Sequence, residues 1–258
     1  MITNAYDVIF DNISSSTHDL MIAFFEGEEP KESIVAEHEY NTYKSKFGDL
    51  KILDIEEKST REFPITLVRE TPIELYQIDS IYKWLMPKDT KFRKLYINHP
   101  AYQGYYYNCK IKNIVAVPIN GYPYAIKCDV FCQSQYALSN VKKQTFTSPT
   151  LPLNFIIVND SSKKLTPTFK FKCGLANGSI TLKNNTTNET MTLTGMSLNE
   201  TITIDYKELQ ISSDVNALVL SKFNKKFLNF KQGVNSLTLS GDVASFEYSY
   251  QNAKVFVH

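Results

Sequence analysis

The amino-acid sequence predicts a mainly β protein of two domains, with one helix in the first domain and a two-sheet sandwich as the second. Three observations lead to this prediction. The 258 residues exceed what one small domain needs, apolar and polar residues alternate along many short segments, and the composition changes partway along the chain. Thirteen of the 16 tyrosines lie before residue 150, whereas Thr and Asn dominate the later part.

The overall composition excludes several functional classes. Hydrophobic residues make up 43% of the chain, which is enough for a substantial core. The 28 basic and 27 acidic residues leave a net charge of +1, so we expect no nucleic-acid partner. The sequence contains no apolar run of the roughly 18 residues that cross a bilayer and no leader at its start, so we expect neither membrane insertion nor conventional secretion.

In the first half of the chain, alternating apolar and polar residues predict strands, and one motif predicts a helix. Strands are predicted within Arg61–Glu70, Gly104–Val117 and Tyr124–Tyr136. Between the first two, Thr71–Glu74 has the form of a capping box, with a hydroxyl three residues before a carboxylate. A helix is expected to follow, to lie on the sheet and to bury Trp84. Four apolar residues at helical spacing are expected to share its inner face: Leu75, Ile78, Tyr82 and Leu85.

Three β-hairpins are predicted in the second half, which is typical of a two-sheet sandwich. Their apolar positions are Ile180 and Leu182 with Met191 and Leu193, then Ile202 and Ile204 with Leu209 and Ile211, then Leu237 and Leu239 with Phe246, Tyr248 and Tyr250. The segment Thr147–Pro152 holds two prolines and small polar residues, so we expect the domains to join there. The predicted domains are therefore residues 1–146 and 151–258.

The Glu-rich segment Glu26–Glu39 leads into an aromatic stretch that begins at Tyr40. Two interpretations remain open, an exposed arm or long hairpin that reaches a neighbouring subunit, and an ordinary mobile loop. The apolar residues that interrupt this solvated stretch are candidate contacts of such an arm: Ile34, Val35, Tyr40 and Tyr43.

The tyrosines around Tyr102–Tyr107 form the densest aromatic cluster, and Tyr102 and Tyr106 are further candidates for a subunit or partner interface. Such rings can stack on sugars or line a protein contact, or alternate tyrosines can fill the core of a sheet. The sequence does not decide between these alternatives.

The residues needed for catalysis or metal binding do not form a recognisable pattern. The four histidines have no ligand spacing, the adjacent Glu56 and Glu57 point to opposite faces of a strand, and no phosphate-binding glycine motif occurs. Cys128 and Cys132 are four apart in a predicted strand, which favours a buried pair of small apolar side chains on one face over a zinc site. We therefore predict a non-enzymatic protein without metal or cofactor.

The order of these elements resembles the distal tail protein (Dit) family of long-tailed bacteriophages. The resemblance covers most of the chain, and the order of its motifs is more specific than any single one. The motifs are Arg61–Arg69, Ile81–Leu85, Phe92–Tyr96, Tyr105–Val117, Tyr124–Ala137, Thr201–Asp205 and Phe230–Leu239.

The resemblance implies a ring-forming N-terminal domain, a galectin-like C-terminal sandwich and assembly as a hexameric ring. The implied partners are other copies of the chain, the tail tube protein, a tail-tip or tail-associated protein, and a baseplate or receptor-binding protein. The implied location is the distal end of the tail of a virion assembled in the host cytoplasm. Closed rings also suit β proteins, because each subunit can cover its neighbour's sheet edge without growing a fibre.

Two other functions remain as alternatives to this hub. One is a carbohydrate-binding adhesin acting through the C-terminal sandwich, with Tyr206 and Tyr248 as exposed aromatic platforms. The other is a hydrolase with an unrecognised carboxylate pair. The sequence does not identify the residues that touch tube or tip, the host, or any glycan ligand.

Overall fold

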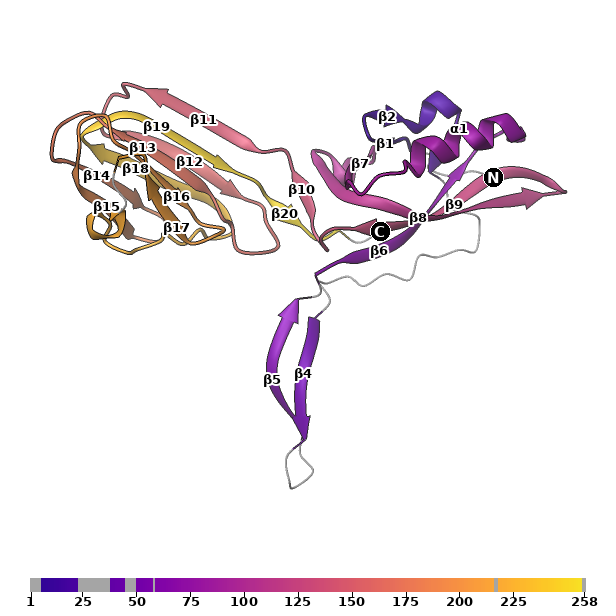
Figure 1. Ribbon diagram of the computed structural model, residues 1–258, viewed down its shortest axis with the longest axis horizontal. Helices are drawn as coiled ribbons and strands as arrows, with labels where there is room; N and C mark the ends of the chain where they lie inside the picture. The colour runs from indigo at the N-terminus through magenta and orange to yellow at the C-terminus, as the bar shows by residue number, and fades with distance from the viewer. Residues whose placement is uncertain (1–5, 23–37, 45–49, 58, 216–217, 257–258) are drawn as a thin grey trace. The chain divides into compact units, whose positions relative to one another are not determined.

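The chain folds into two compact units in the computed structural model, which describes residues 6–22, 38–44, 50–57, 59–215 and 218–256. The first unit comprises Met1–Leu138 with Val255–His258, and the second comprises Ser139–Lys254 (Figure 1). The division lies earlier than the join expected near Thr147–Pro152. The reason is that strand β11, Lys142–Thr147, pairs along its whole length with β19 of the second unit. The mainly β fold with one helix is confirmed.

One antiparallel sheet forms the centre of the first unit, with strand order β2-β1-β7-β8-β9-β6-β3. The longest pairing joins β8 to β9 across a tight turn, where Asn120 and Gly121 both have positive φ, as a type I′ hairpin requires. The three strands predicted in this half are confirmed as β6, β8 and β9. The bounds are β1 Val8–Phe10, β2 Ile13–Ser14, β3 Met21–Ile22, β6 Arg61–Val68, β7 Arg93–Ile97, β8 Tyr105–Ile119 and β9 Tyr122–Cys132, with 3-10 helices η1 Ser15–His18 and η2 Pro100–Tyr102.

Helix α1, Leu75–Leu85, begins later than the predicted capping box at Thr71–Glu74. Its N-cap is Glu74, and the Gln77 side chain accepts a hydrogen bond from the Glu74 backbone N–H at 2.9 Å. Arg69 donates to the same Gln77 oxygen at 2.6 Å. The cap is therefore built three residues further along, by the Glu74 carboxylate that ends the predicted motif and by the Gln77 amide.

The inner face of α1 also differs from the prediction. Ile81, Trp84 and Leu85 are buried, whereas Leu75 and Tyr82 are exposed. The indole N–H of Trp84 donates to the carbonyl oxygen of Phe10 at 3.0 Å, which joins the helix to β1. This bond and the packing of the indole in the core select the face, so the helix lies on the sheet with Trp84 in the core as predicted.

A second antiparallel pair, β4 His38–Lys44 and β5 Leu50–Glu57, forms a two-stranded sheet of its own. Tyr40 pairs with Ile55 and Tyr43 with Lys51 in its register. Of the arm or hairpin predicted at Glu26–Glu39, only His38 and Glu39 are described, and they begin β4. Residues 26–37 of the predicted arm lie outside the described residues.

The second unit is a two-sheet sandwich with strand orders β11-β19-β13-β16-β17 and β12-β18-β14-β15. Its core joins both sheets, and Phe246 lies among packed aromatic rings, with the Phe155 ring tilted against it at 5.3 Å and the Phe171 ring stacked on it at 5.1 Å. The bounds are β12 Leu153–Asn159, β13 Thr168–Cys173, β14 Gly178–Asn184, β15 Glu189–Met196, β16 Thr201–Asp205, β17 Gln210–Ser213, β18 Gly233–Gly241 and β19 Val243–Tyr250, with η3 Val219–Lys222. Two short strands outside the sandwich, β10 Ala137–Ser139 and β20 Ala253–Lys254, lie where the chain passes between the units.

Two of the three predicted hairpins of this unit are confirmed, and the third is wrong. β14 pairs with β15, and β16 pairs with β17. In contrast, β18 and β19 belong to different sheets, so the chain crosses the sandwich at Gly241 instead of turning back on itself. Gly241 has a φ of 102°, and the next residue, Asp242, donates its backbone N–H to the Ser179 carbonyl oxygen at 2.7 Å. Strand alternation is the same for a hairpin and for a crossing between sheets, so the sequence pattern could not distinguish them.

Replacing Gly241 with alanine is expected to destabilise the second unit by more than about 2 kcal/mol, because the φ is unfavourable for an L residue. The added Cβ would also overlap the Ser179 carbonyl oxygen. Gly233→Ala is the matched control, since Gly233 has a φ of 87° but open space around its Cα. Urea unfolding measures both variants. Equal losses of stability would show that the close approach to Ser179 contributes nothing.

Candidate interaction surfaces of the first unit

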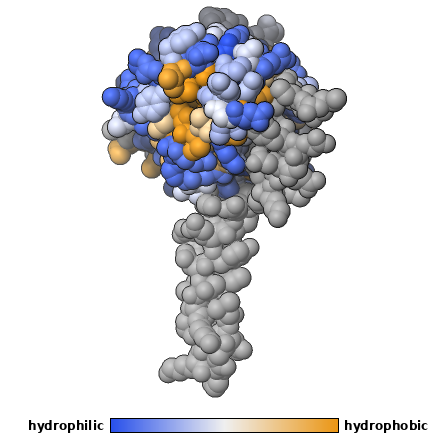
Figure 2. Space-filling model, turned by 90° about the vertical axis from the view of Figure 1, so that its right-hand side faces the viewer, coloured by the Kyte–Doolittle hydropathy of each residue, from blue (hydrophilic) through white to orange (hydrophobic). Residues whose placement is uncertain are grey.

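Exposed apolar residues gather where the β8–β9 hairpin turns and where α1 begins. Figure 2 looks onto the side that lies at the right of Figure 1 and shows hydrophobic side chains on this face, bordered by hydrophilic ones. We call five residues the apolar end patch. Their exposed fractions are 85% for Leu75, 74% for Tyr76, 50% for Val115, 43% for Ile119 and 64% for Tyr122.

Backbone hydrogen bonds bring these residues to one end of the sheet. Ile119 and Tyr122 face each other across the tight turn. The Ile73 N–H donates to the Pro123 carbonyl oxygen at 2.7 Å, so the residues that lead into α1 run beside the start of β9. Strand β7 pairs with β8 only from Tyr107 to Cys109, and β6 pairs with β9 only as far as Ala125. The end of the hairpin thus extends beyond both of these neighbouring strands, which leaves it available for contacts with other proteins.

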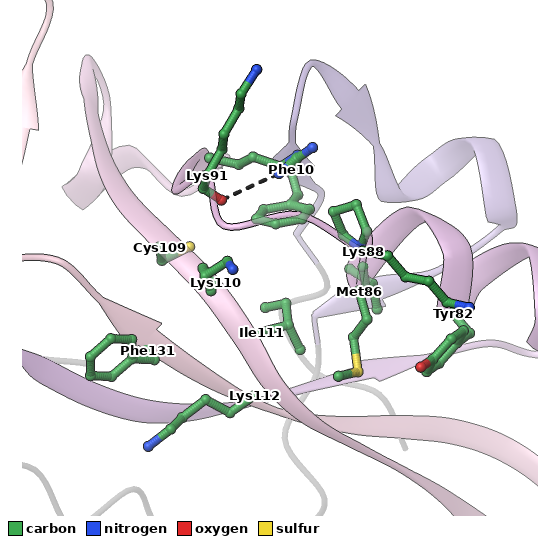
Figure 3. Close-up of a pocket in the computed structure, with 13 residues that line it drawn as sticks. Phe10, Tyr82, Met86, Lys88, Lys91, Cys109, Lys110, Ile111, Lys112 and Phe131 are labelled. Atoms are coloured by element: carbon green, nitrogen blue, oxygen red, sulfur yellow. Dashed lines mark hydrogen bonds between the residues drawn. The ribbon is translucent and has the colours of Figure 1, made fainter.

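A basic pocket of about 390 Å³ lies between the end of α1 and strand β8 (Figure 3). Its apolar wall contains Phe10, Ile111 and Met86, and in Figure 3 Met86 and Ile111 lie side by side between the helix and the strand. Five cationic side chains and no carboxylate line the pocket. They are Lys88, Lys91, Arg93, Lys110 and Lys112.

Two of the five cations are already neutralised. Arg93 binds Asp89 through both oxygens at 2.8 and 2.7 Å and Asp11 at 2.7 Å. The hydrogen bonds from Arg93 lower the pKa of the Asp89 carboxyl well below its usual range, so it stays ionised. Lys112 pairs with Glu62 at 2.7 Å. These pairs hold the rim of the pocket in place. Because Asp11, Asp89 and Glu62 oppose five cations, the pocket and its rim keep a net charge of +2, and Lys88, Lys91 and Lys110 form no ion pair among the described residues.

The predicted interface tyrosines of the 102–107 cluster lie inside the first unit. Tyr102 and Tyr106 are both buried, and the Tyr102 ring packs on Phe256 at 4.7 Å. The Tyr106 ring packs on Tyr96 at 5.3 Å and carries the Lys94 ammonium 4.4 Å from its centre. Their packing accounts for them as core residues, while a role in a subunit contact stays a prediction.

The candidate contacts in the arm are placed only in part. Tyr40 and Tyr43 lie in β4, and Ile34 and Val35 lie outside the described residues. Neither the apolar end patch nor the basic pocket was predicted from the sequence. The Asn120–Gly121 turn between Ile119 and Tyr122 is a signal that could have indicated the patch. The lysines of the pocket are scattered over residues 88–112 and come together only in the fold.

The predicted buried cysteines of β9 are confirmed, because Cys128 and Cys132 are both inaccessible. Burial raises the pKa of the Cys128 thiol to about 12. Cys132 lies opposite Cys109 in the register of β8 and β9, and the hydrogen bond between the two thiols, with burial, raises the pKa of Cys109. Across the described ranges, no three His, Cys, Asp or Glu side chains are grouped as metal ligands, and no helix is long and apolar enough to cross a bilayer.

The expected aromatic platforms of the second unit are not exposed, which corrects the prediction for Tyr206 and Tyr248. Both rings are buried. The Tyr206 hydroxyl accepts a hydrogen bond from the Leu228 backbone N–H at 2.9 Å, and the Tyr248 hydroxyl bonds to Gln144 at 2.7 Å. Neither ring can stack on a sugar, because both are packed into the core between the two sheets.

Two protein families match the sequence. One is described as a phage tail protein N-terminal domain and matches residues 3–134. The chain belongs to this phage tail protein family. The second match, described as a phage tail C-terminal domain, covers residues 136–250 of the tail protein. A comparison with curated proteins finds no match.

Solved structures show which fold the tail protein has. The Dit protein of phage SPP1 matches with a TM-score of 0.62 and 9% identity, over 96% of this chain and 99% of that one, and it is described as a paradigm of the hub adsorption apparatus in phages that infect Gram-positive bacteria. Two structures of the phage p2 baseplate in its activated conformation also match, each with a TM-score of 0.43 and 11% identity. The match to the structure with Ca covers 99% of this chain and 100% of that one. The match to the structure with Sr covers 98% of this chain and 99% of that one. The SPP1 match confirms the predicted two-part β fold and its likeness to the fold of a distal tail protein.

Proposed function

We propose that the tail protein is a non-enzymatic hub at the distal end of the phage tail. In this role the first unit closes into a ring with other copies, hexameric as the family resemblance implies. The ring joins the tail tube protein to a tail-tip or tail-associated protein. The second unit, a galectin-like sandwich, holds baseplate or receptor-binding proteins. The virion assembles in the host cytoplasm.

The match to the SPP1 Dit protein, described as part of a hub, carries this proposal, because it covers both units from end to end. The apolar end patch supports it independently. A soluble subunit that exposes apolar side chains together gains free energy when another protein covers them. Cyclic closure lets every copy bury such a surface without leaving a free end.

The mass of the full chain in solution tests the proposal. We expect light scattering to report a hexameric multiple of the 29.6 kDa chain, and electron microscopy down the symmetry axis to show a ring with a central channel. Purified tails should carry the same ring at their distal end. A chain that stays monomeric at high concentration, together with tails that lack the ring, would contradict the hub.

A further inference from the structure

The basic pocket at the end of α1 has more positive charge than its own surroundings balance. Among the residues that the structure describes, Lys88, Lys91 and Lys110 form no ion pair, and the Lys110 ammonium donates only to the Asp89 carbonyl oxygen at 2.6 Å. Lys88 and Lys91 are exposed. Three ammonium groups beside an apolar wall fit a segment that offers carboxylates together with aliphatic side chains.

The chain itself contains a segment of this chemistry. Residues 26–37 carry five glutamates against one lysine, and Ile34 and Val35 stand between Glu32 and Glu37. The segment has a formal charge of −4 and lies outside the described residues. Its charge is opposite to that of the pocket, and its two adjacent aliphatic side chains match the wall formed by Phe10, Met86 and Ile111.

We propose that the basic pocket of one copy receives the Glu26–Glu37 segment of a second copy. The contact is heterologous, since each copy offers one pocket and one segment, and repeated contacts of this kind close a ring. Lys88, Lys91 and Lys110 bind the glutamates, and Ile34 or Val35 packs on the apolar wall. This inference rests on the proposed function, because it names a contact between neighbouring copies of the ring.

A charge exchange tests the contact in the full chain. The pocket variant carries Lys88→Glu and Lys91→Glu, and the segment variant carries Glu28→Lys and Glu29→Lys. Each variant should raise the concentration at which half of the chains are assembled by at least about tenfold. Combining all four substitutions should restore it to within about threefold of the wild-type chain, because opposite charges again face each other. Lys164→Glu with Lys183→Glu is the matched control, since both lysines are exposed in the second unit and the change in net charge is the same. Analytical ultracentrifugation measures each variant.

A mixture of the pocket variant and the segment variant shows whether the segment comes from another copy. At a concentration where each variant alone is mostly monomeric, the mixture should assemble. An intact pocket then faces an intact segment at one contact, and the exchanged charges face each other at the next. Rescue by the fourfold variant without assembly of the mixture would place the segment in the pocket of its own copy and overturn the proposal. The proposal would also be overturned if the pocket variant assembled at the same concentration as the control variant. That result would overturn it even if the pocket variant no longer bound another tail protein.

A direct binding titration tests the pocket independently of ring formation. A fluorescent synthetic peptide of residues 26–37 should bind the wild-type chain and the control variant. It should bind the Lys88→Glu, Lys91→Glu variant at least about tenfold more weakly, and raised salt should weaken binding. Wild-type chains that stay monomeric yet bind the peptide would contradict the proposed hub but support the pocket. Rings that form while the peptide binds both variants equally would support the hub and overturn the pocket.

Discussion

Replacing Leu75 and Ile119 with aspartate is expected to prevent ring formation. Both side chains belong to the apolar end patch, and burial of each contributes at least about 1.5 kcal/mol. Losing both raises the dissociation constant of the contact by at least about 100-fold, before the cost of burying two carboxylates is counted. Sedimentation of the full chain over a range of concentrations measures the change.

The design leaves the fold intact. Leu75 is the first residue of α1 and is 85% exposed, and an aspartate at a helix N-terminus interacts favourably with the helix dipole. Leu175→Asp with Leu198→Asp is the control, because both leucines are more than half exposed in the second unit. The control should assemble as the wild-type chain does. If both variants assemble equally well, the apolar end patch is not the contact between copies.

Glu200→Ala is expected to cost the second unit about 3–5 kcal/mol of folding free energy, because it leaves a charged lysine buried without its partner. The Glu200 side chain is fully buried, and its carboxylate accepts hydrogen bonds from Lys222 at 2.6 Å and from Ser213 at 2.7 Å. The backbone N–H of Ser197 adds a third bond at 2.7 Å. Glu200 therefore ties the β15–β16 loop to the end of β17 and to η3. Differential scanning calorimetry of the full chain should show a lower transition for this unit.

The contribution of Glu200 depends on pH in a defined direction. Burial opposes ionisation of the carboxyl, but the bonds from Lys222, Ser197 and Ser213 outweigh it and lower its pKa below the ordinary value of 4.5. The stabilisation is therefore complete above that ordinary value and is lost as the pH falls through the lowered pKa. Glu200→Gln removes the titration, so its stability deficit should shrink on acidification. A deficit that stays constant down to acid denaturation would show that ionisation of Glu200 contributes nothing.

Local patterns predicted most strands correctly because alternation reports which side chains share a face. Phe63, Ile65 and Leu67 of β6 are buried as their spacing indicates, and so are Ile180 and Leu182 of β14. The pattern failed at α1, where two stripes at helical spacing compete. The hydrogen bond from Trp84 to Phe10 joins residues 74 positions apart, so only the assembled sheet could select the buried stripe.

The candidate surfaces were harder to predict than the fold. The predicted Tyr102 is buried against Phe256, a residue near the other end of the chain, whereas Leu75 was expected in the core and is exposed. Exposure depends on which elements cover a strand, and coverage is decided by contacts distant in sequence. The same reason explains the buried Tyr206, which would have been exposed on a sheet with one open face.

By itself, the sequence determined a mainly β chain in two parts, a single helix and a likeness to distal tail proteins, because periodicity and the order of elements are local properties. Only the tertiary structure decided that β18 and β19 lie in different sheets, that lysines between residues 88 and 112 line one pocket, and that apolar residues of α1 and the β8–β9 hairpin share one end of a sheet. Each of these depends on the packing of separate elements, and the free energy of that packing comes from the whole core rather than from any segment.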